Sequence, residues 1–455
     1  MCVLDYTYTF DHIGEQLKKG QLRLTDHATN QTRTVRVAVD DYKLPFKHNQ
    51  ATPPLLADLT DLAAAVHIAD RLSKNQKDMP RRMLIRLPIR QSDILDQPFI
   101  HHKLQKLLYW FTEDEWSFEF LPYTKDGRSS ELRPCLPLPQ ATAYPTRVVL
   151  WSGGLDGFAG LYQQLKREQQ VCYTLFGTGG NDMIAHAQRC TAAAIGRLFP
   201  RRTKLVQLPL RLSESRTIQK SSSARSRGFV FMLLGAVYAY QEGQSTLYIY
   251  ENGIGAINLP FRASEVGLDH SRSVHPLSLH YMGELLSSIL GGPFSFQNPF
   301  LFQMKAQMCR EPLFADAAEG VFKLTISCDS RHRKRPIQCG YCSSCLLRQQ
   351  AIAVQGIADE TSYQITDALR GKRKRSYGTH YYAMLAQVQM MRKLLASPDP
   401  WERMAQHYKH GHLEDIAEKM SEQECDVKEQ ILHLYQNYVR EWESVKHIIG
   451  PEFLE

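Results

Sequence analysis

The feature that most restricts the fold of this chain is an alternation of short apolar strands and helical stretches that starts at Arg147. Residues 147–151, 171–176, 203–208 and 246–251 read as strands, and stretches with apolar residues at helical spacing follow them. Alternation of this kind is typical of a parallel sheet with helices on both of its faces. We therefore predict an α/β domain in the middle of the chain.

In an open parallel sheet, ligands bind at the carboxyl ends of the strands. Those ends are residues 152–157 and the segments that start at Gly177 and at Glu251, where Asn252 follows. We therefore expect Gly177, Glu251 and Asn252 to lie with residues 152–157 at the edge of the sheet that binds a nucleotide.

The first strand leads into a glycine-rich turn, which is followed by a helix from about Phe158. The residues of this turn are Ser152, Gly153, Gly154, Leu155, Asp156 and Gly157. Glycines let the backbone approach an anion closely, and the helix N-terminus favours negative charge. Ser152 can donate a hydroxyl hydrogen bond, and Asp156 can orient Mg²⁺ or a basic partner. The turn predicts a phosphate-binding loop, although glycine turns after strands also occur without a phosphate.

The second motif is a set of cysteines with the spacing Cys-x10-Cys-x2-Cys-x2-Cys, at Cys328, Cys339, Cys342 and Cys345. Four thiolates are what a closed, structural zinc site needs. Ten cysteines in 455 residues are too few for a disulfide-rich chain. We predict a structural Zn²⁺ site here, with an iron–sulfur cluster or four unconnected buried cysteines as the alternatives.

The order of the motifs carries a family resemblance. Ser-Gly-Gly-Leu-Asp after a buried strand resembles the PP-loop (SGGxDS) of the N-type ATP pyrophosphatases. The elements that follow are Ser226-Arg227-Gly228, Met304-Lys305-Ala306-Gln307 and the sequence CGYCSSCLLR that starts at Cys339. In this order they resemble the 7-cyano-7-deazaguanine synthase (QueC) family. The resemblance covers about residues 147–355 and implies a Rossmann-like (HUP/PP-loop) domain with a four-cysteine zinc site.

The resemblance implies an ATP-dependent ligase that acts on a 7-deazaguanine carboxylate. ATP would bind with its phosphates at residues 152–157, with Mg²⁺ held partly by Asp156. The substrate carboxylate would be adenylylated while Arg227 and Lys305 neutralise developing charge. An amine would then displace AMP to give an amide, which a second activation converts to a nitrile. Two departures from the family pattern are Gly157 in place of a serine and Gln307 in place of an acid.

About half of the chain lies outside this region. Residues 1–140 are expected to form an N-terminal α+β accessory or partner-binding domain, with strands at 34–39 and 83–87 and a helix over 55–72. Residues 356–455 are expected to be a helical extension. The long form resembles the QueC-like component of Qat-type bacterial anti-phage defence operons. That resemblance implies partner proteins from the same operon, and one of them is a candidate amine acceptor.

Charge and hydropathy leave other functions open. The net charge of +8 and the basic runs at 331–335 and 370–375 also suit a PP-loop enzyme that modifies tRNA. A nucleotide-binding scaffold subunit, with catalysis weakened at Gly157 and Gln307, is the remaining alternative. The N-terminus does not have the pattern of a secretory signal, and the apolar run 229–240 is too short to span a bilayer. We therefore expect a cytoplasmic protein with no membrane partner.

Overall fold

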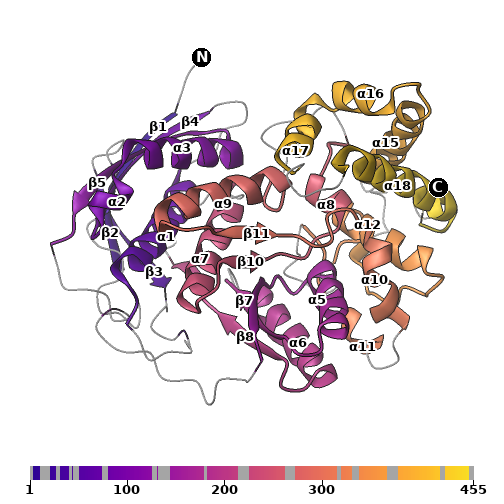
Figure 1. Cartoon of the computed structure of the whole chain (residues 1–455), viewed down its shortest axis with the longest axis horizontal. Coiled ribbons are helices and arrows are strands. Elements are labelled where there is room, and N and C mark those ends of the chain that lie inside the picture. Colours follow the sequence, from indigo (N-terminus) through magenta and orange to yellow (C-terminus); the bar gives the residue numbers. More distant parts are fainter. Residues whose placement is uncertain are drawn as a thin grey trace.

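The computed structural model describes residues 4–10, 21–26, 31–39, 44, 51–73, 80–124, 131, 144–178, 182–213, 225–261, 272–314, 319–329, 338–365, 378–420 and 426–449. Both basic runs noted above lie outside the described residues. Two sheets lie in the left and central parts of the molecule, and helices fill its right-hand part (Figure 1).

The central sheet has five strands in the order β11-β10-β6-β7-β8, and every pairing in it is parallel. Its strands are β6 (Thr146–Leu150), β7 (Cys172–Gly177), β8 (Thr203–Gln207), β10 (Thr246–Tyr248) and β11 (Ser295–Gln297). All six residues of β7 are buried, as expected for a strand covered on both faces. The predicted α/β domain with a parallel sheet is therefore confirmed.

Helices cover both faces of this sheet. On one face, α5 (Leu155–Arg167) and α6 (Asp182–Leu198) pack against inward side chains such as Val149 and Leu175. On the other face, α7 (Arg227–Gln241) and α9 (Pro276–Leu290) pack against Val148 and Phe176. The alternation of side chains along each strand thus divides the apolar residues between two cores.

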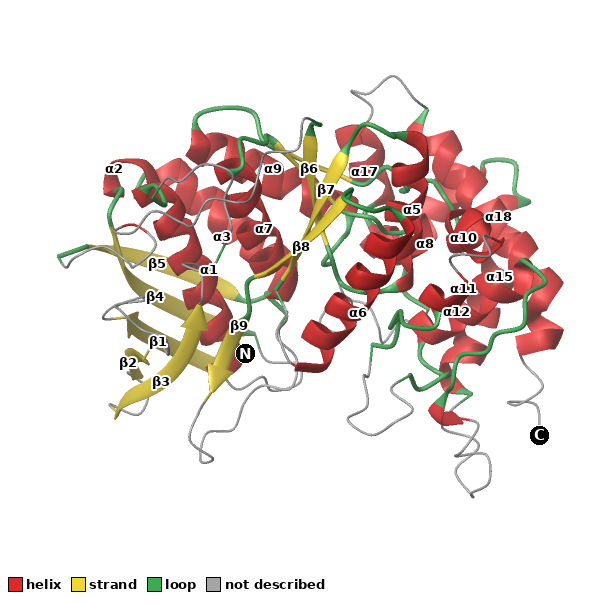
Figure 2. Cartoon of the chain, turned by 90° about the horizontal axis from the view of Figure 1, so that it is seen from below, coloured by secondary structure: helices red, strands yellow, loops and turns green. Residues whose placement is uncertain are grey.

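Five N-terminal strands and one strand from the middle of the chain form a mixed six-stranded sheet with the order β5-β4-β1-β2-β3-β9 (Figure 2). Its strands are β1 (Leu4–Phe10), β2 (Gln21–Asp26), β3 (Gln31–Val39), β4 (Arg81–Ile89), β5 (Glu115–Pro122) and β9 (Leu210–Ser213). The helices are α1 (Pro54–Leu72), α2 (Ser92–Leu95) and α3 (Pro98–Thr112). The predicted strands at 34–39 and 83–87 and the helix over 55–72 lie within β3, β4 and α1.

Packing crosses the expected boundary at residue 140. Strand β9 comes from the middle of the chain and pairs antiparallel with β3. One hydrophobic core contains side chains of α1 and α3 together with those of α7 and α9. A chain cut at residue 140 would therefore expose the apolar faces of α7 and α9.

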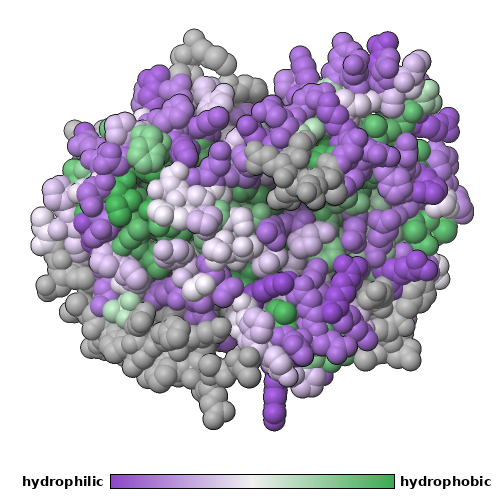
Figure 3. Space-filling model, viewed as in Figure 1, coloured by the Kyte–Doolittle hydropathy of each residue, from purple (hydrophilic) through white to green (hydrophobic). Residues whose placement is uncertain are grey.

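The C-terminal helices pack on the loops that follow the central sheet. The helices of this part of the chain are α8 (Gly253–Ile257), α10 (Lys305–Phe314), α11 (Glu319–Phe322), α12 (Ser343–Val354), α15 (Thr379–Leu395), α16 (Pro400–His407), the 3-10 turn η4 (Lys409–Gly411), α17 (Leu413–Met420) and α18 (Val427–Ile449). A second core joins α15–α18 to α8 and α12. On the face that Figure 3 shows, hydrophilic side chains predominate over the helices α15–α18. Among the described residues, no helix has the length and apolar character needed to cross a bilayer.

Candidate functional site

The predicted phosphate loop joins β6 to α5, and its backbone requires glycine. Gly153 has φ +76°, and a Cβ added there would lie 3.0 Å from the backbone N of Gln188. The backbone N–H of Gly154 donates to Ser152 Oγ at 3.1 Å. Helix α5 begins at Leu155, three residues earlier than the predicted start at Phe158. Asp156 therefore lies in the first turn of a helix rather than in a loop.

Gln188 on α6 supports this loop. The sequence shows it only as a polar residue beside the buried face of a helix. Its Nε2 donates to the carbonyl of Trp151 at 2.7 Å, and its Oε1 accepts from Gln207 Nε2 at 2.8 Å. A Cβ on Gly177 would lie 2.5 Å from that Oε1. Gly177 therefore makes room for the buried Gln188 side chain.

Four of the predicted site residues form one cluster at the carboxyl ends of β6 and β10. Lys305 Nζ donates to Asp156 Oδ2 at 2.5 Å. Asn252 Nδ2 donates to Asp156 Oδ1 at 2.9 Å and to Glu251 Oε1 at 2.7 Å. Asp156 and Lys305 are only 8% and 5% exposed. Two carboxyl groups and one ammonium thus share a largely buried site beside the phosphate loop.

Burial and charge shift the protonation of this cluster. Burial, followed by the negative charge of Asp156, raises the pKa of Glu251 to about 8. Burial alone would lower the pKa of Lys305, but the charges of Asp156 and Glu251 outweigh it and raise that pKa. At neutral pH, Glu251 therefore carries a proton while Lys305 stays charged and paired with Asp156.

The proton on Glu251 predicts a pH dependence of stability. Between pH 4.5 and about 8 the native chain keeps a proton that the unfolded chain has released, so rising pH weakens the folded state. The slope is about 1.4 kcal/mol per pH unit at most. Glu251→Gln keeps the acceptor for Asn252 and removes the titration. We expect the Tm of the parent chain to fall relative to this variant from pH 5 to 8 and to level off above that. A Tm difference that is constant with pH would contradict the assignment.

Local structure holds Glu251 and Asn252 in place. Asn252 is the N-cap of α8, where its Oδ1 accepts from the backbone N of Gly255 at 3.0 Å. Asn298, just after β11, donates to the carbonyl of Glu251 at 2.8 Å and accepts from its N–H at 3.3 Å. The backbone on both sides of the Glu251 side chain is therefore fixed.

Helix α10 begins at Lys305, and Gln307 caps it. The backbone N–H of Met304 donates to Gln307 Oε1 at 2.7 Å, which is the return bond of a capping box. An amide oxygen accepts this bond as a carboxylate would. The departure from the family pattern at Gln307 therefore retains a structural role.

Arg227 lies on α7, which contributes no residue to the cluster of Asp156, Glu251, Asn252 and Lys305. It is the exposed first residue of α7, and its guanidinium carbon lies 4.9 Å from the centre of the Phe231 ring. A Cβ on Gly235, two turns later, would meet Leu150 at the end of β6. Because α7 returns the chain to a parallel strand, it runs antiparallel to the sheet. The start of α7 is therefore at the carboxyl edge of the sheet, where the phosphate loop also lies.

The four predicted zinc ligands converge, and all are buried: Cys328, Cys339, Cys342 and Cys345. Their sulfur atoms lie within 4.8 Å of one another, with Cys339 to Cys345 at 3.9 Å and Cys328 to Cys342 at 4.0 Å. Sulfurs around a tetrahedral Zn²⁺ are about 3.8 Å apart. Gly340, with φ +85°, forms the turn between two of the ligands. The cluster could therefore hold zinc.

The zinc cluster and the phosphate loop are connected through residues 322–326. Arg348 on α12 is fully buried and donates to Thr325 Oγ1 at 2.7 Å and to the carbonyl of Phe322 at 2.9 Å. Ile326, the next residue, donates its N–H to the carbonyl of Gly153 at 3.2 Å. Displacement of the cysteine cluster would therefore move a segment that contacts the phosphate loop.

Gly157 has room for the Cβ of the serine that the family motif carries. A Cβ there would lie 3.8 Å from both Ser152 Oγ and the Trp151 ring, which is ordinary contact. We expect Gly157→Ser to raise the free energy of unfolding by up to about 0.5 kcal/mol, because glycine disfavours a helix. The new hydroxyl should lower the KM for ATP. Gly153→Ser is the control, because it places a Cβ at positive φ against backbone and should destabilise the fold. A higher KM in Gly157→Ser would contradict this account of the loop.

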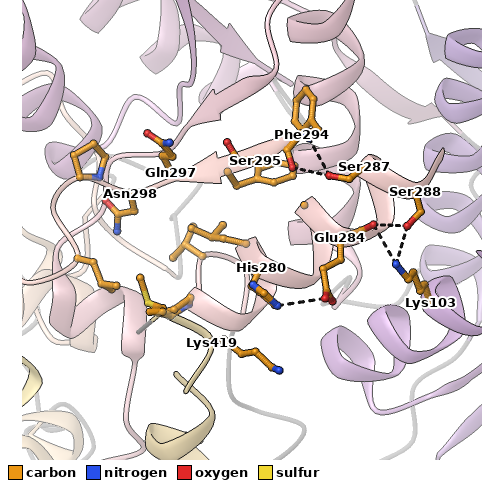
Figure 4. A pocket seen from close by; sticks show the side chains of 18 residues that line it. Lys103, His280, Glu284, Ser287, Ser288, Phe294, Ser295, Gln297, Asn298 and Lys419 are labelled. Carbon is orange, nitrogen blue, oxygen red and sulfur yellow. Dashed lines mark hydrogen bonds and ion pairs between the residues drawn. The ribbon is translucent and has the colours of Figure 1, made fainter. Parts of the chain in front are cut away.

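A cavity of about 680 Å³ lies between α9 and β11 and also has walls from α3 and α17 (Figure 4). Lys103, His280, Glu284 and Lys419 point toward it. Asn298 is among its lining residues, so the cavity shares a wall with the backbone of Glu251. The residues of the phosphate loop are not among those that line it.

Comparisons with known proteins agree with the family resemblance. Three curated relatives, each named 7-cyano-7-deazaguanine synthase, are 28% identical to this chain. The Pseudomonas aeruginosa protein matches over 236 residues, 48% of this chain and 97% of its own length. The Pseudomonas syringae protein matches over 236 residues, 48% and 95%, and the Pseudomonas fluorescens protein over 243 residues, 49% and 97%. About half of the chain is similar to this synthase.

These relatives support a QueC-like family for the matched half of the chain. None of the protein-family models searched matches this chain. The resemblance of the long form to the Qat-type defence component stays a prediction.

Proposed function

We propose that this chain is an ATP-dependent ligase that adenylylates the carboxylate of a 7-carboxy-7-deazaguanine-like substrate. The observation that carries the proposal is the buried ion pair of Asp156 and Lys305, to which Asn252 joins Glu251. This cluster lies beside the glycine-rich loop that leads into α5. The name of the relatives supplies the class of substrate. A loop of this kind binds phosphate through backbone N–H groups and the helix N-terminus.

The chain's own residues have separable roles in this reaction. The backbone of residues 152–157 binds the phosphates of ATP. Asp156 and Glu251 offer the oxygen ligands that Mg²⁺ prefers, and bound Mg²⁺ would neutralise phosphate charge. Lys305 and Arg227 supply positive charge where it develops around the α-phosphorus. Binding of Mg²⁺ would release the proton of Glu251. The affinity of the site for Mg²⁺ should therefore rise as the pH approaches 8.

The reaction consists of two displacement steps. A carboxylate oxygen of the substrate attacks the α-phosphorus of ATP, and the bond to pyrophosphate breaks. An amine then attacks the acyl carbon, loses a proton and displaces AMP, which leaves an amide. Dehydration of a primary amide by a second activation would give a nitrile.

The amine acceptor is a separate part of the proposal. An acyl adenylate is an electrophile that any well-placed amine can attack. We propose that the acceptor is an amine of a partner protein that the same anti-phage defence operon encodes. The extended chain supports this, because residues outside the matched half offer surface for a macromolecule. Ammonia, with nitrile formation, is the other outcome of the test.

Intact-mass spectrometry separates these acceptors. The enzyme is incubated with ATP, 7-carboxy-7-deazaguanine and each candidate partner protein. A mass gain on the partner equal to the substrate minus water is the expected result. Free 7-cyano-7-deazaguanine with every partner unmodified would contradict the protein acceptor. ATP binding without turnover would favour a scaffold subunit, and turnover that requires tRNA would favour a tRNA-modifying enzyme.

A further inference from the structure

Asp70 at the end of α1 binds the residue that precedes α7. The backbone N–H and the hydroxyl of Ser226 donate to Asp70 Oδ2 at 2.9 and 2.7 Å. Both residues are 0% exposed. Two bonds from one residue to one carboxylate fix the position and the orientation of the backbone there. The next residue is Arg227, the first residue of α7.

The carboxylate of Asp70 is itself held by a buried ionic network. Arg81 Nη2 donates to Asp70 Oδ1 at 2.7 Å and to Asp114 Oδ2 at 2.6 Å, and all three side chains are 0% exposed. Arg225 Nη2 lies 3.4 Å from Asp114 Oδ1. The two acids and two arginines balance in charge, as buried ions must. The pairing therefore links the chain on the N-terminal side of α7 to α1 and β4.

A second set of contacts involves the chain that follows Arg227. Arg272 donates to the carbonyl of Trp110 at 2.7 Å and to Glu113 at 3.2 Å. A Cβ on Gly228, in the first turn of α7, would lie 2.7 Å from Ser273 Cα. The end of α3 and the residues after it thus contact Arg225 directly and reach the first turn of α7 through Arg272 and Ser273.

We infer that the N-terminal block is part of the framework of the active site, in which Asp70, held by Arg81 and Asp114, positions Arg227. The inference rests on the role of Arg227 in the proposed function. Asp70 is a positioning residue, because it acts on the reaction through Ser226 and the first turn of α7.

The test uses the full chain and a matched control. Asp70→Asn leaves one acceptor oxygen in place of two, so the side chain cannot accept from both Ser226 and Arg81. Asp58→Asn changes another α1 aspartate with a fully buried side chain, which pairs with Arg90 instead. Ser226→Ala is a milder variant that removes one bond and leaves the ionic network intact. Arg227→Ala and the double variant Asp70→Asn/Arg227→Ala complete the cycle. The readouts are carboxylate-dependent AMP formation, the KM for ATP, and amide hydrogen exchange of residues 225–232.

Asp70→Asn is expected to lower kcat by about 100-fold, the usual effect of a misplaced catalytic group, with little change in the KM for ATP. It should cause no further loss in the Arg227→Ala background, because it acts through that side chain. Hydrogen exchange in the first turn of α7 should rise in Asp70→Asn and, less, in Ser226→Ala, but not in Asp58→Asn.

Three results would overturn the inference: equal losses of kcat in Asp70→Asn and Asp58→Asn, full additivity with Arg227→Ala, or unchanged exchange in residues 225–232. Should the parent chain form no AMP, the proposed function fails, and the exchange measurement alone then decides whether Asp70 fixes α7.

Discussion

Replacing Asp156 with alanine is expected to lower turnover by a factor on the order of 10³ and the free energy of unfolding by about 3–5 kcal/mol. Turnover falls because the phosphate site loses a carboxylate and misplaces Lys305. Stability falls because Lys305, 5% exposed and 2.5 Å from Asp156, would keep a buried charge without its partner. Carboxylate-dependent AMP release and denaturant unfolding measure the two effects.

The control for this prediction is the double variant Asp156→Ala/Lys305→Met. Removal of both charges should restore most of the lost stability, since an apolar pair costs little to bury. Turnover should stay absent. An Asp156→Ala chain that turns over at the parent rate would show that this loop has been misassigned. A double variant as unstable as the sum of the single ones would show that the pair is not coupled.

Replacing Cys342 with serine is expected to yield insoluble or metal-free protein. Binding of structural zinc contributes about 10–16 kcal/mol to folding in small zinc domains, and a chain with three thiolates loses much of it. The parent chain should contain about one zinc per molecule. Any soluble Cys342→Ser protein should also bind ATP more weakly, because residues 322–326 connect the cysteine cluster to the carbonyl of Gly153.

Cys172→Ser is the matched control, because Cys172 is a buried cysteine outside the cluster. It should keep the zinc and the fold. Metal analysis decides the identity of the ion. A parent chain with no zinc, or one with the visible absorption of an iron–sulfur cluster, would contradict the assignment.

Local patterns predicted much of the central domain. The strands at 147–151 and 171–176 and the glycine-rich turn after Trp151 depend on neighbouring residues alone, so their sequence signal is direct. The cysteine spacing likewise identified a cluster whose members lie close in sequence. Strand β10 is three residues shorter than predicted and ends at Tyr248.

Contacts between distant residues were not predictable from these patterns. Strand β9, at 210–213, pairs with β3 more than 170 residues earlier, and a four-residue strand has little signal of its own. Gln188 and Asp70 look like ordinary polar residues of amphipathic helices, because their partners are far away in sequence. The sequence does not indicate the α5 start at Leu155, because Asp156 and Gly157 suit a loop. In the structure, an ion pair with Lys305 stabilises Asp156 in the helix.

Transfer of an oxygen atom from the substrate to AMP would reveal adenylylation of the substrate carboxylate. The chain is incubated with unlabelled ATP and 7-carboxy-7-deazaguanine that carries ¹⁸O in its carboxylate. Because the attacking oxygen stays on phosphorus when the acyl–oxygen bond breaks, AMP should gain one ¹⁸O atom and unlabelled pyrophosphate should form in equal amount. Unlabelled AMP, or ADP and phosphate as the products, would contradict the account.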